Sequence, residues 1–328
     1  MMSSPQLVEA LFPERTRKAL DALVDLAPGV ITDLSTPESW VVLPEVEVLI
    51  TGWGAPALAD EDLDRMPRLR AVIHSGGVAR PYLGSAPERR GIVASNSGYF
   101  NSIPVAEFTL ALIILSGKNA LENAAAYRTH QDRMDRTALL WRSGNFRRTV
   151  GIVGASRVGR LLIERLAQSS FHILVHDPFL RPAEAAELGV EAVGLDDLLT
   201  RADVVSLHVP VLPSTTGMIG PRELRLIRDG ATFINTARGA IVDQDALVQE
   251  LRTGRFTAYL DTTDPEPLPA DHELYALPNV FLTPHIAGSL GNELLRLGEN
   301  VVAETERFVT GQPFAYPEKP PTPATGTK

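Results

Sequence analysis

Three polar residues in the last third of the chain could together move a proton beside a bound anion: Arg238, Glu266 and His285. Each follows a short apolar run, so we expect each side chain to project from the end of a buried strand. A guanidinium can orient a carboxylate through paired hydrogen bonds. An imidazole backed by a carboxylate keeps one tautomer and can act as a general acid or base.

Simpler interpretations exist for each residue taken alone. Arg238 could form a surface salt bridge, Glu266 could be an ordinary loop acid, and His285 could cap the helix that follows it. The combination matters more than any member, because a cation, a carboxylate and an imidazole at neighbouring strand ends make an acid–base site.

A glycine turn lies upstream, in residues 151–159 with the sequence GIVGASRVG. The strand before it and the helix after it favour a dinucleotide site, where Gly154 permits the turn and Gly159 allows close packing. Free N–H groups at the helix start would hold a pyrophosphate. Ser156 replaces the usual middle glycine; its Cβ crowds the phosphate, although its hydroxyl can donate a hydrogen bond. Arg157 adds a cation.

An aspartate supports this interpretation. Asp177 ends the next apolar run and lies 18 residues after Gly159, near the spacing expected for a ribose-binding carboxylate. Such a carboxylate accepts hydrogen bonds from ribose hydroxyls and repels a 2′-phosphate, so we expect NAD rather than NADP. Arg181 keeps NADP open as the less favoured cofactor.

Composition limits the class of partner. The chain has 328 residues, enough for two domains, and a net charge of −9. This charge argues against nucleic acid or an anionic membrane as the main partner. An anionic substrate would then need a local cation, which strengthens the interest in Arg238.

The chain has no cysteine, which excludes disulfides, zinc–thiolate sites, iron–sulfur clusters and thiol nucleophiles. We predict no metal site and a cytoplasmic location. The first residues lack the basic and apolar blocks of a signal peptide. The longest apolar stretch, 105–115, is shorter than the ~20 residues of a membrane span, so we expect a buried helix.

Strand and helix signals alternate along the chain, which predicts an α/β fold with doubly wound parallel sheets. A small sheet is expected from strands at 46–50, 69–73 and 92–94. Pro104 is expected in the first turn of a helix over 105–116. The polar stretch 119–148, which includes Trp141, is also expected to be helical. Further strands are expected at 149–153, 173–176, 204–208, 231–235, 257–260 and 280–283. Further helices are expected at 158–168, 182–188, 196–200, 221–227, 243–252 and 290–309. The tail from 313 is expected to be loose.

Taken in order, these motifs resemble the D-isomer-specific 2-hydroxyacid dehydrogenase family. The matching strings are VAE at 105–107, the glycine turn, HDP at 176–178, LHVP at 207–210, NTARG at 235–239, EPL at 266–268 and TPHIAG at 283–288. The resemblance implies a flavodoxin-like substrate domain made of 1–101 and 288–328. A Rossmann NAD-binding domain, 102–287, would be inserted into it. It also implies a homodimer that pairs through the NAD-binding domain.

The resemblance further implies roles for individual residues. Arg238 would bind substrate, and Glu266 would support His285 as the acid/base. The backbone N–H groups of Ser75, Gly76 and Gly77 would hold the substrate carboxylate, and Asp261 would face the nicotinamide amide. The other expected cofactor contacts are Val158, His208, Pro210, Thr215, Thr236 and Ala237, together with Gly154, Ser156, Arg157, Gly159, Asp177 and His285.

One loop departs from the family pattern. Residues 76–80 read GGVAR and lack the usual aspartate, so His74 and Arg80 are hypothesised to tune substrate choice. The leading prediction is an NAD-dependent oxidoreductase acting at C2 of a small 2-oxo or 2-hydroxy acid. The alternatives are oxidation of 3-phosphoglycerate and a non-catalytic NAD-responsive binding protein or corepressor. The three intact polar residues argue against the last.

Overall fold

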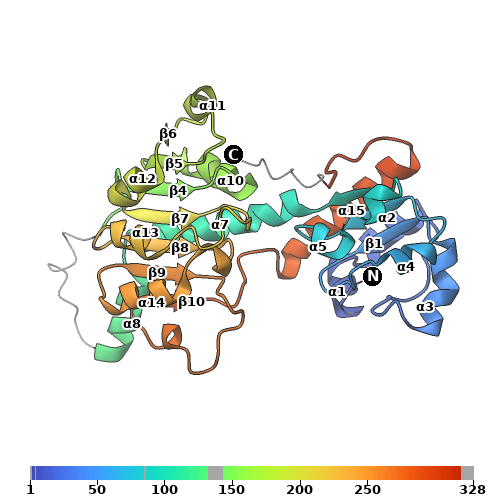
Figure 1. Cartoon of the computed structure of the whole chain (residues 1–328), viewed down its shortest axis with the longest axis horizontal. Coiled ribbons are helices and arrows are strands. Elements are labelled where there is room, and N and C mark those ends of the chain that lie inside the picture. The colour runs from blue at the N-terminus through green and yellow to red at the C-terminus, as the bar shows by residue number, and fades with distance from the viewer. Residues whose placement is uncertain (1, 4, 85, 132–142, 319–328) are drawn as a thin grey trace. The chain divides into compact units, whose positions relative to one another are not determined.

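The computed structural model describes residues 2–3, 5–84, 86–131 and 143–318. Trp141 and the tail beyond Glu318 lie outside this part. The chain divides into two compact units, one formed by Met1–Ser102 with Ser289–Lys328 and the other by Ile103–Gly288 (Figure 1). Both ends of the chain therefore contribute to the first unit, and each unit is described by itself below.

The unit Ile103–Gly288 is built on a seven-stranded parallel sheet in the order β10-β9-β8-β7-β4-β5-β6. The order reverses between β4 and β7, so loops from both halves leave the carboxyl edge of the sheet there. The predicted doubly wound sheet is confirmed, and only the two-residue β6 has no counterpart among the predicted strands. The strands are β4 (Thr149–Val153), β5 (His172–His176), β6 (Glu191–Ala192), β7 (Val204–Leu207), β8 (Thr232–Asn235), β9 (Thr257–Leu260) and β10 (Val280–Leu282).

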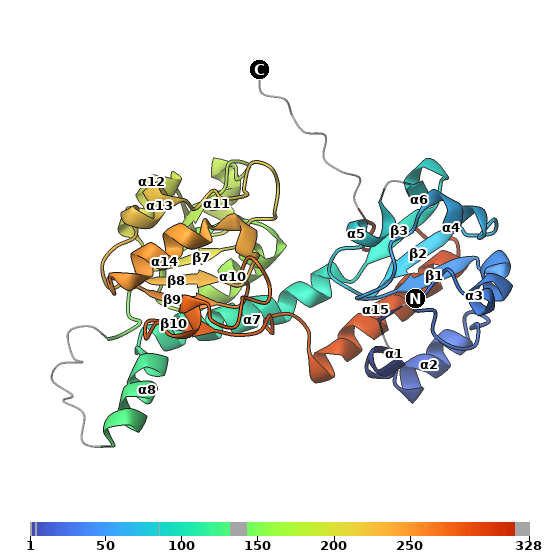
Figure 2. The ribbon, with the colours of Figure 1, turned by 60° about the horizontal axis from the view of Figure 1, so that its bottom comes forward.

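Helices cover both faces of this sheet, as Figure 2 shows for α12 and α13 on one side and α7 on the other. Successive strand residues enter opposite cores: Leu174 packs in the first, and Ile173 and Val175 pack in the second. The strands are thus apolar on both faces, as buried parallel strands are. The first face carries α12 (Leu195–Arg201), α13 (Pro221–Leu226) and α14 (Gln244–Arg252), and the second carries α7 (Gly98–Ser116), α10 (Arg157–Leu166) and α11 (Pro182–Glu187).

The other unit has a smaller parallel sheet with its strands in chain order, β1-β2-β3. Residues 316–318 add an antiparallel segment at the β3 edge, where Asn96 N–H donates to the Tyr316 carbonyl and Glu318 N–H to that of Ala94. The strands are β1 (Val48–Thr51), β2 (Ala71–His74) and β3 (Val93–Asn96). One face packs on α1 (Pro5–Leu11), α2 (Glu14–Asp21) and α15 (Leu294–Val309), and the other on α4 (Asp60–Asp64), α5 (Arg80–Leu83) and α6 (Ala86–Arg89). A further helix, α3 (Pro37–Val42), precedes β1.

Two predicted helix starts were wrong. Helix α7 begins at Gly98, whose N–H is capped by the Asn96 side chain at 2.9 Å, so Pro104 lies inside the helix. A proline there removes one backbone hydrogen bond but does not end this helix. Helix α15 begins at Leu294, after a 3₁₀ turn over Gly291–Glu293.

Helix α7 is the one helix in the described ranges whose length and apolarity would suit a membrane span, by those two criteria alone. Its Ala106 and Ile113 belong to the core of the unit Ile103–Gly288, and core helices of soluble proteins meet the same criteria. The stretch 119–148 contains α8 (Ala120–His130), which buries none of its residues.

The two ends of the chain meet where α15 crosses α1. A Cβ placed on Gly298 would lie 1.8 Å from the Leu11 carbonyl oxygen, so the backbones touch at this point. Leu11 and Leu297 beside it are fully buried. This contact joins the C-terminal helix to the N-terminal segment.

We expect Gly298→Ala to destabilise the protein by about 1–3 kcal/mol, because the added methyl group forces α15 away from α1. Gly194→Ala is the matched control, since a Cβ on Gly194 meets no atom within 4 Å. Thermal unfolding of both variants measures the effect. Equal melting temperatures would show that α15 and α1 do not need this close approach.

Candidate active site

The turn after β8 presents Arg238. The Asn235 side chain shapes it by accepting from Ala237 N–H at 3.0 Å and donating to the Arg238 carbonyl at 2.9 Å. The Arg238 side chain is exposed, and its Nη1 donates to the Ala237 carbonyl at 2.6 Å. The sequence prediction that Arg238 projects from a strand end therefore agrees with its position.

Gly239 brings this turn against the loop that leads to Glu266. A Cβ on Gly239 would lie 2.1 Å from the carbonyl carbon of Thr263, so the two backbones are in contact. Gln244 at the start of α14 holds the same loop by accepting from Asp264 N–H at 2.9 Å. The glycine next to Arg238 was the signal for this contact, but the sequence did not show which segment it approaches.

His285 and Glu266 form a direct pair. His285 Nδ1 lies 2.7 Å from Glu266 Oε1, and the two side chains are 41% and 42% exposed. A carboxylate at Nδ1 fixes the proton on that nitrogen and leaves Nε2 to face a reactant. The structure thus joins two of the three predicted residues and packs the turn of the third against the same loop.

A buried carboxylate, Asp261 at the end of β9, holds the turn that carries His285. Its two oxygens accept from the Thr283 hydroxyl (2.6 Å) and from the backbone N–H groups of Ile286 (2.8 Å) and Ala287 (2.9 Å). His285 itself has φ of +55°, a left-handed conformation that few non-glycine residues adopt without support. The contact of Asp261 with a nicotinamide amide stays a prediction, and its observed contacts make it the support of the His285 turn.

The glycine turn after β4 has the geometry that a dinucleotide needs. Gly154 has φ of +102°, and a Cβ on Gly159 would lie 2.2 Å from the Gly154 carbonyl oxygen. Ser156 is the N-cap of α10, with φ of −69°, so the backbone there does not require glycine. Arg157 and Val158 form the first turn of the helix, where backbone N–H groups have no carbonyl partner within the helix.

Asp177 joins the ends of β4 and β5. Its oxygens accept from Ala155 N–H and from Phe179 N–H, each at 2.8 Å. A carboxylate oxygen accepts more than one hydrogen bond, so these contacts orient the group without exhausting it. Its place beside the glycine turn fits a ribose diol and opposes a 2′-phosphate, which favours NAD.

The remaining expected cofactor contacts have protein partners of their own. His208 is buried, its Nε2 lies 2.8 Å from the Ser206 hydroxyl, and burial lowers its pKa to about 3. The Thr215 hydroxyl donates to the Pro210 carbonyl at 2.5 Å, and the Thr236 hydroxyl lies 2.8 Å from that of Thr109. These residues shape the edge of the sheet after β7 and β8.

The expected substrate loop follows β2 in the unit that contains both chain ends. The expectation that Ser75 offers its N–H to a substrate does not hold, because this group donates to the Thr51 carbonyl at 2.8 Å. The Ser75 hydroxyl donates to the same carbonyl at 3.0 Å. Gly76 and Gly77 remain as candidates for backbone donors.

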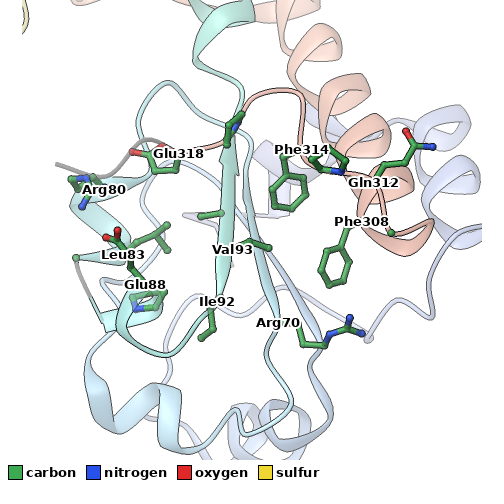
Figure 3. A pocket seen from close by; sticks show the side chains of 16 residues that line it. Arg70, Arg80, Leu83, Glu88, Ile92, Val93, Phe308, Gln312, Phe314 and Glu318 are labelled. Atoms are coloured by element: carbon green, nitrogen blue, oxygen red, sulfur yellow. The ribbon is translucent and has the colours of Figure 1, made fainter. Parts of the chain in front are cut away.

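His74 and Arg80 have different surroundings. His74 is fully buried behind the loop, with Nδ1 2.9 Å from the Thr51 hydroxyl and its ring 5.0 Å from that of Tyr82. A Cβ on Gly76 would lie 2.4 Å from His74 Nε2, so the imidazole packs directly against the glycine. Arg80 lines a separate cavity (Figure 3). His74 therefore packs against Gly76, whereas Arg80 at the end of the loop lines the cavity.

Residues 110–287 match the family model described as "D-isomer specific 2-hydroxyacid dehydrogenase, NAD binding domain". The chain belongs to this family. The matched segment lies within the unit Ile103–Gly288, which contains the glycine turn, Asp177 and all three predicted acid–base residues. Its cofactor is NAD, as the resemblance implied, and the glycine turn and Asp177 fit this cofactor.

Relatives agree on the family and differ in activity. The chain is 32% identical to D-3-phosphoglycerate dehydrogenase of Mycobacterium leprae over 82% of its own length and 50% of the relative. It thus spans about half the length of such curated relatives. It is 34% identical to glyoxylate reductase of Korarchaeum cryptofilum over 68% of each chain. D-lactate dehydrogenase of Aquifex aeolicus, solved with NAD and lactic acid, superposes with a TM-score of 0.72 at 26% identity over 94% of this chain and 95% of that one.

We expect Asp261→Asn to cost about 1–3 kcal/mol of stability, because an amide NH2 would face the backbone N–H groups that the carboxylate now accepts. The His285 turn should loosen. Faster amide hydrogen exchange at 285–287, with unchanged exchange in β4, would support this role. Thr283→Val removes only the hydroxyl donor and should have the smaller effect. Wild-type protection in Asp261→Asn would contradict the assignment.

Burial holds the pKa of His74 at about 4, below the ordinary 6.5. Between these values the unfolded chain binds a proton that the folded chain excludes, so stability falls as the pH drops from 6.5 towards 4. At pH 5 the resulting loss of folding free energy is about 2 kcal/mol. The melting temperature of His74→Asn should therefore fall less between pH 7.5 and pH 5 than that of the wild type. His130→Asn changes an exposed histidine and should behave like the wild type. If the melting temperature of His74→Asn fell with pH as much as that of His130→Asn, the linkage would be refuted.

Proposed function

We propose that the protein is an NAD-dependent oxidoreductase that interconverts a small 2-oxo acid and the corresponding D-2-hydroxy acid. The observation that carries this proposal is the 2.7 Å contact between His285 Nδ1 and Glu266, in the same unit as a dinucleotide turn. Membership in the family supports the reaction class.

When bound, NADH supplies the hydride for C2 of the substrate. His285, protonated on both ring nitrogens, donates the Nε2 proton to the C2 oxygen as that oxygen gains negative charge. Glu266 stabilises the imidazolium and orients the ring. In the oxidising direction neutral His285 takes the hydroxyl proton at Nε2. The same pair therefore serves both directions.

Arg238 is proposed to bind the substrate carboxylate and to polarise the C2 carbonyl through its forked N–H groups. On a chain with net charge −9 it supplies the positive charge that an anionic substrate needs. Gly76 and Gly77 are proposed to add backbone N–H groups to the carboxylate.

The proposed substrate is a small 2-oxo acid, in keeping with the glyoxylate reductase relative, which the chain covers over 68% of its length. Oxidation of 3-phosphoglycerate is the second candidate, because the D-3-phosphoglycerate dehydrogenases are about as similar in sequence. A non-catalytic NAD-responsive protein is the third, and the contact between His285 and Glu266 argues against it, since a sensor does not need an acid–base pair.

We further propose a cytoplasmic homodimer that pairs through the NAD-binding unit, with neither nucleic acid nor membrane as a partner. Helix α8 buries none of its residues and exposes Tyr127, and the end of α7 exposes Ile114 and Leu115. Exposed apolar side chains of this kind suit a protein contact. The absence of cysteine and the negative charge support the location and the excluded partners.

We expect His285→Gln to lower kcat by about 10²–10⁴-fold with NADH affinity unchanged, because only the proton transfer is removed. Glu266→Gln should lower kcat less, and Arg238→Lys should chiefly raise KM. His130→Gln is the control and should match the wild type. The assays are NADH oxidation and NADH fluorescence titration. Near-normal kcat in His285→Gln would overturn the assignment.

The substrate is found by the same NADH assay with glyoxylate, hydroxypyruvate, pyruvate, branched and aromatic 2-oxo acids and 3-phosphohydroxypyruvate. A preference for the small unphosphorylated acids supports the leading proposal, and a preference for 3-phosphohydroxypyruvate selects the second candidate. Tight NADH binding without consumption by any of these acids selects the sensor.

A further inference from the structure

The unit that contains both chain ends has a cavity of about 730 Å³ around the edge strand β3 (Figure 3). Helices α5 and α6 line one side, and the end of α15 with residues 311–318 lines the other. All of its lining residues belong to this one unit, and none of them is a predicted cofactor or acid–base residue. The volume is in the range of small-molecule sites.

One side of this cavity has an apolar wall. The rings of Phe308 and Phe314 stack 6.2 Å apart with an interplanar angle of 25°. Val93 of β3 lies near them in Figure 3 and is 49% exposed, high for a β-branched residue in a strand. An exposed valine beside aromatic side chains offers an apolar body a surface from which to displace water.

The wall is fixed in place by a buried carboxylate. Glu304 of α15 is 1% exposed and accepts from the backbone N–H groups of Ala315 (3.0 Å) and Tyr316 (3.3 Å). The Tyr316 ring packs on Phe100 and stacks on Tyr99. The segment that carries Phe314 is therefore ordered before any ligand arrives, which lowers the entropy cost of binding.

Arg70 places an incompletely neutralised cation beside this wall. Its guanidinium lies 5.1 Å from the centre of the Phe308 ring, and its ion pair with Glu47 is long, at 3.7 Å. The other oxygen of Glu47 pairs with Arg68 at 2.7 Å. Across the described ranges the Arg70 side chain makes no hydrogen bond, so its donors can serve an incoming anion.

The opposite side of β3 has more negative than positive charge. Figure 3 shows Arg80 there with Glu88 and Glu318, so one cation lies among two carboxylates. An anion would be repelled by the acids on that side and attracted to Arg70 on the other. The charge distribution thus assigns one end of the cavity to an acidic group.

We propose that this cavity is a second binding site, which takes a monocarboxylic acid with an apolar body. The carboxylate pairs with Arg70, and the body lies along Phe308, Phe314 and Val93. Binding involves no chemical step and does not depend on the oxidoreductase reaction.

The test uses octanoate as the probe and isothermal titration calorimetry of the full chain with and without saturating NADH. We expect Arg70→Gln to weaken octanoate binding at least about tenfold, because a charge-assisted pair is lost. Arg65→Gln is the matched control: this exposed arginine lies 5.2 Å over the Trp40 ring, outside the cavity, and the variant should bind octanoate like the wild type. Octan-1-ol should bind more weakly than octanoate.

A second variant, Val93→Glu, places a carboxylate near Arg70 at an exposed position and should abolish binding. Absence of octanoate binding, equal binding in Arg70→Gln, or competition with NADH would each overturn the proposal. Repeating the titration in His285→Gln separates this proposal from the reaction, since octanoate should bind that variant with wild-type affinity even if it has no turnover.

Discussion

The proposed chemistry depends on the buried carboxylate of Asp261. Three donors from the segment after β10 converge on it, at 2.6, 2.8 and 2.9 Å. They hold the backbone of a turn in which His285 adopts a left-handed conformation, one that costs about 1–3 kcal/mol for a residue with a side chain. The imidazole meets Glu266 only because this backbone is held. The acid–base pair is thus exposed to a reactant while its support is protected from water.

Close backbone contacts do similar work elsewhere on the same edge. Gly239 lets the Arg238 turn touch the loop that carries Glu266, and Gly159 lets α10 approach the turn at Gly154. At both places a single methyl group would separate two segments that must present groups side by side. A reactive side chain can be exchanged without changing the fold, but these glycines cannot, because their role is to leave space.

Much of the fold and part of the site followed from sequence because their signals are local. Apolar runs placed the strands of the large sheet to within about a residue, and strand ends placed Arg238 and His285. Contacts between distant segments carried no such signal. The sequence did not show that the Asp261 carboxylate accepts hydrogen bonds from residues 283–287. It also did not show that the Ser75 N–H donates to the Thr51 carbonyl. The start of α7 was predicted wrongly because a proline such as Pro104 fits a first helical turn, whereas the helix begins at the Asn96 cap.

The two units divide the proposed work unequally. The acid–base pair, the guanidinium and the dinucleotide turn all lie in Ile103–Gly288. The loop after β2 is proposed to add the uncharged backbone of Gly76 and Gly77, and Gly76 packs on the buried, neutral imidazole of His74. Backbone N–H groups that bind the carboxylate, which all 2-oxo acids share, do not distinguish the side chains at C3. Choice among these acids must therefore come from side chains around the bound acid, which explains why one family framework accompanies relatives named for lactate, glyoxylate and 3-phosphoglycerate.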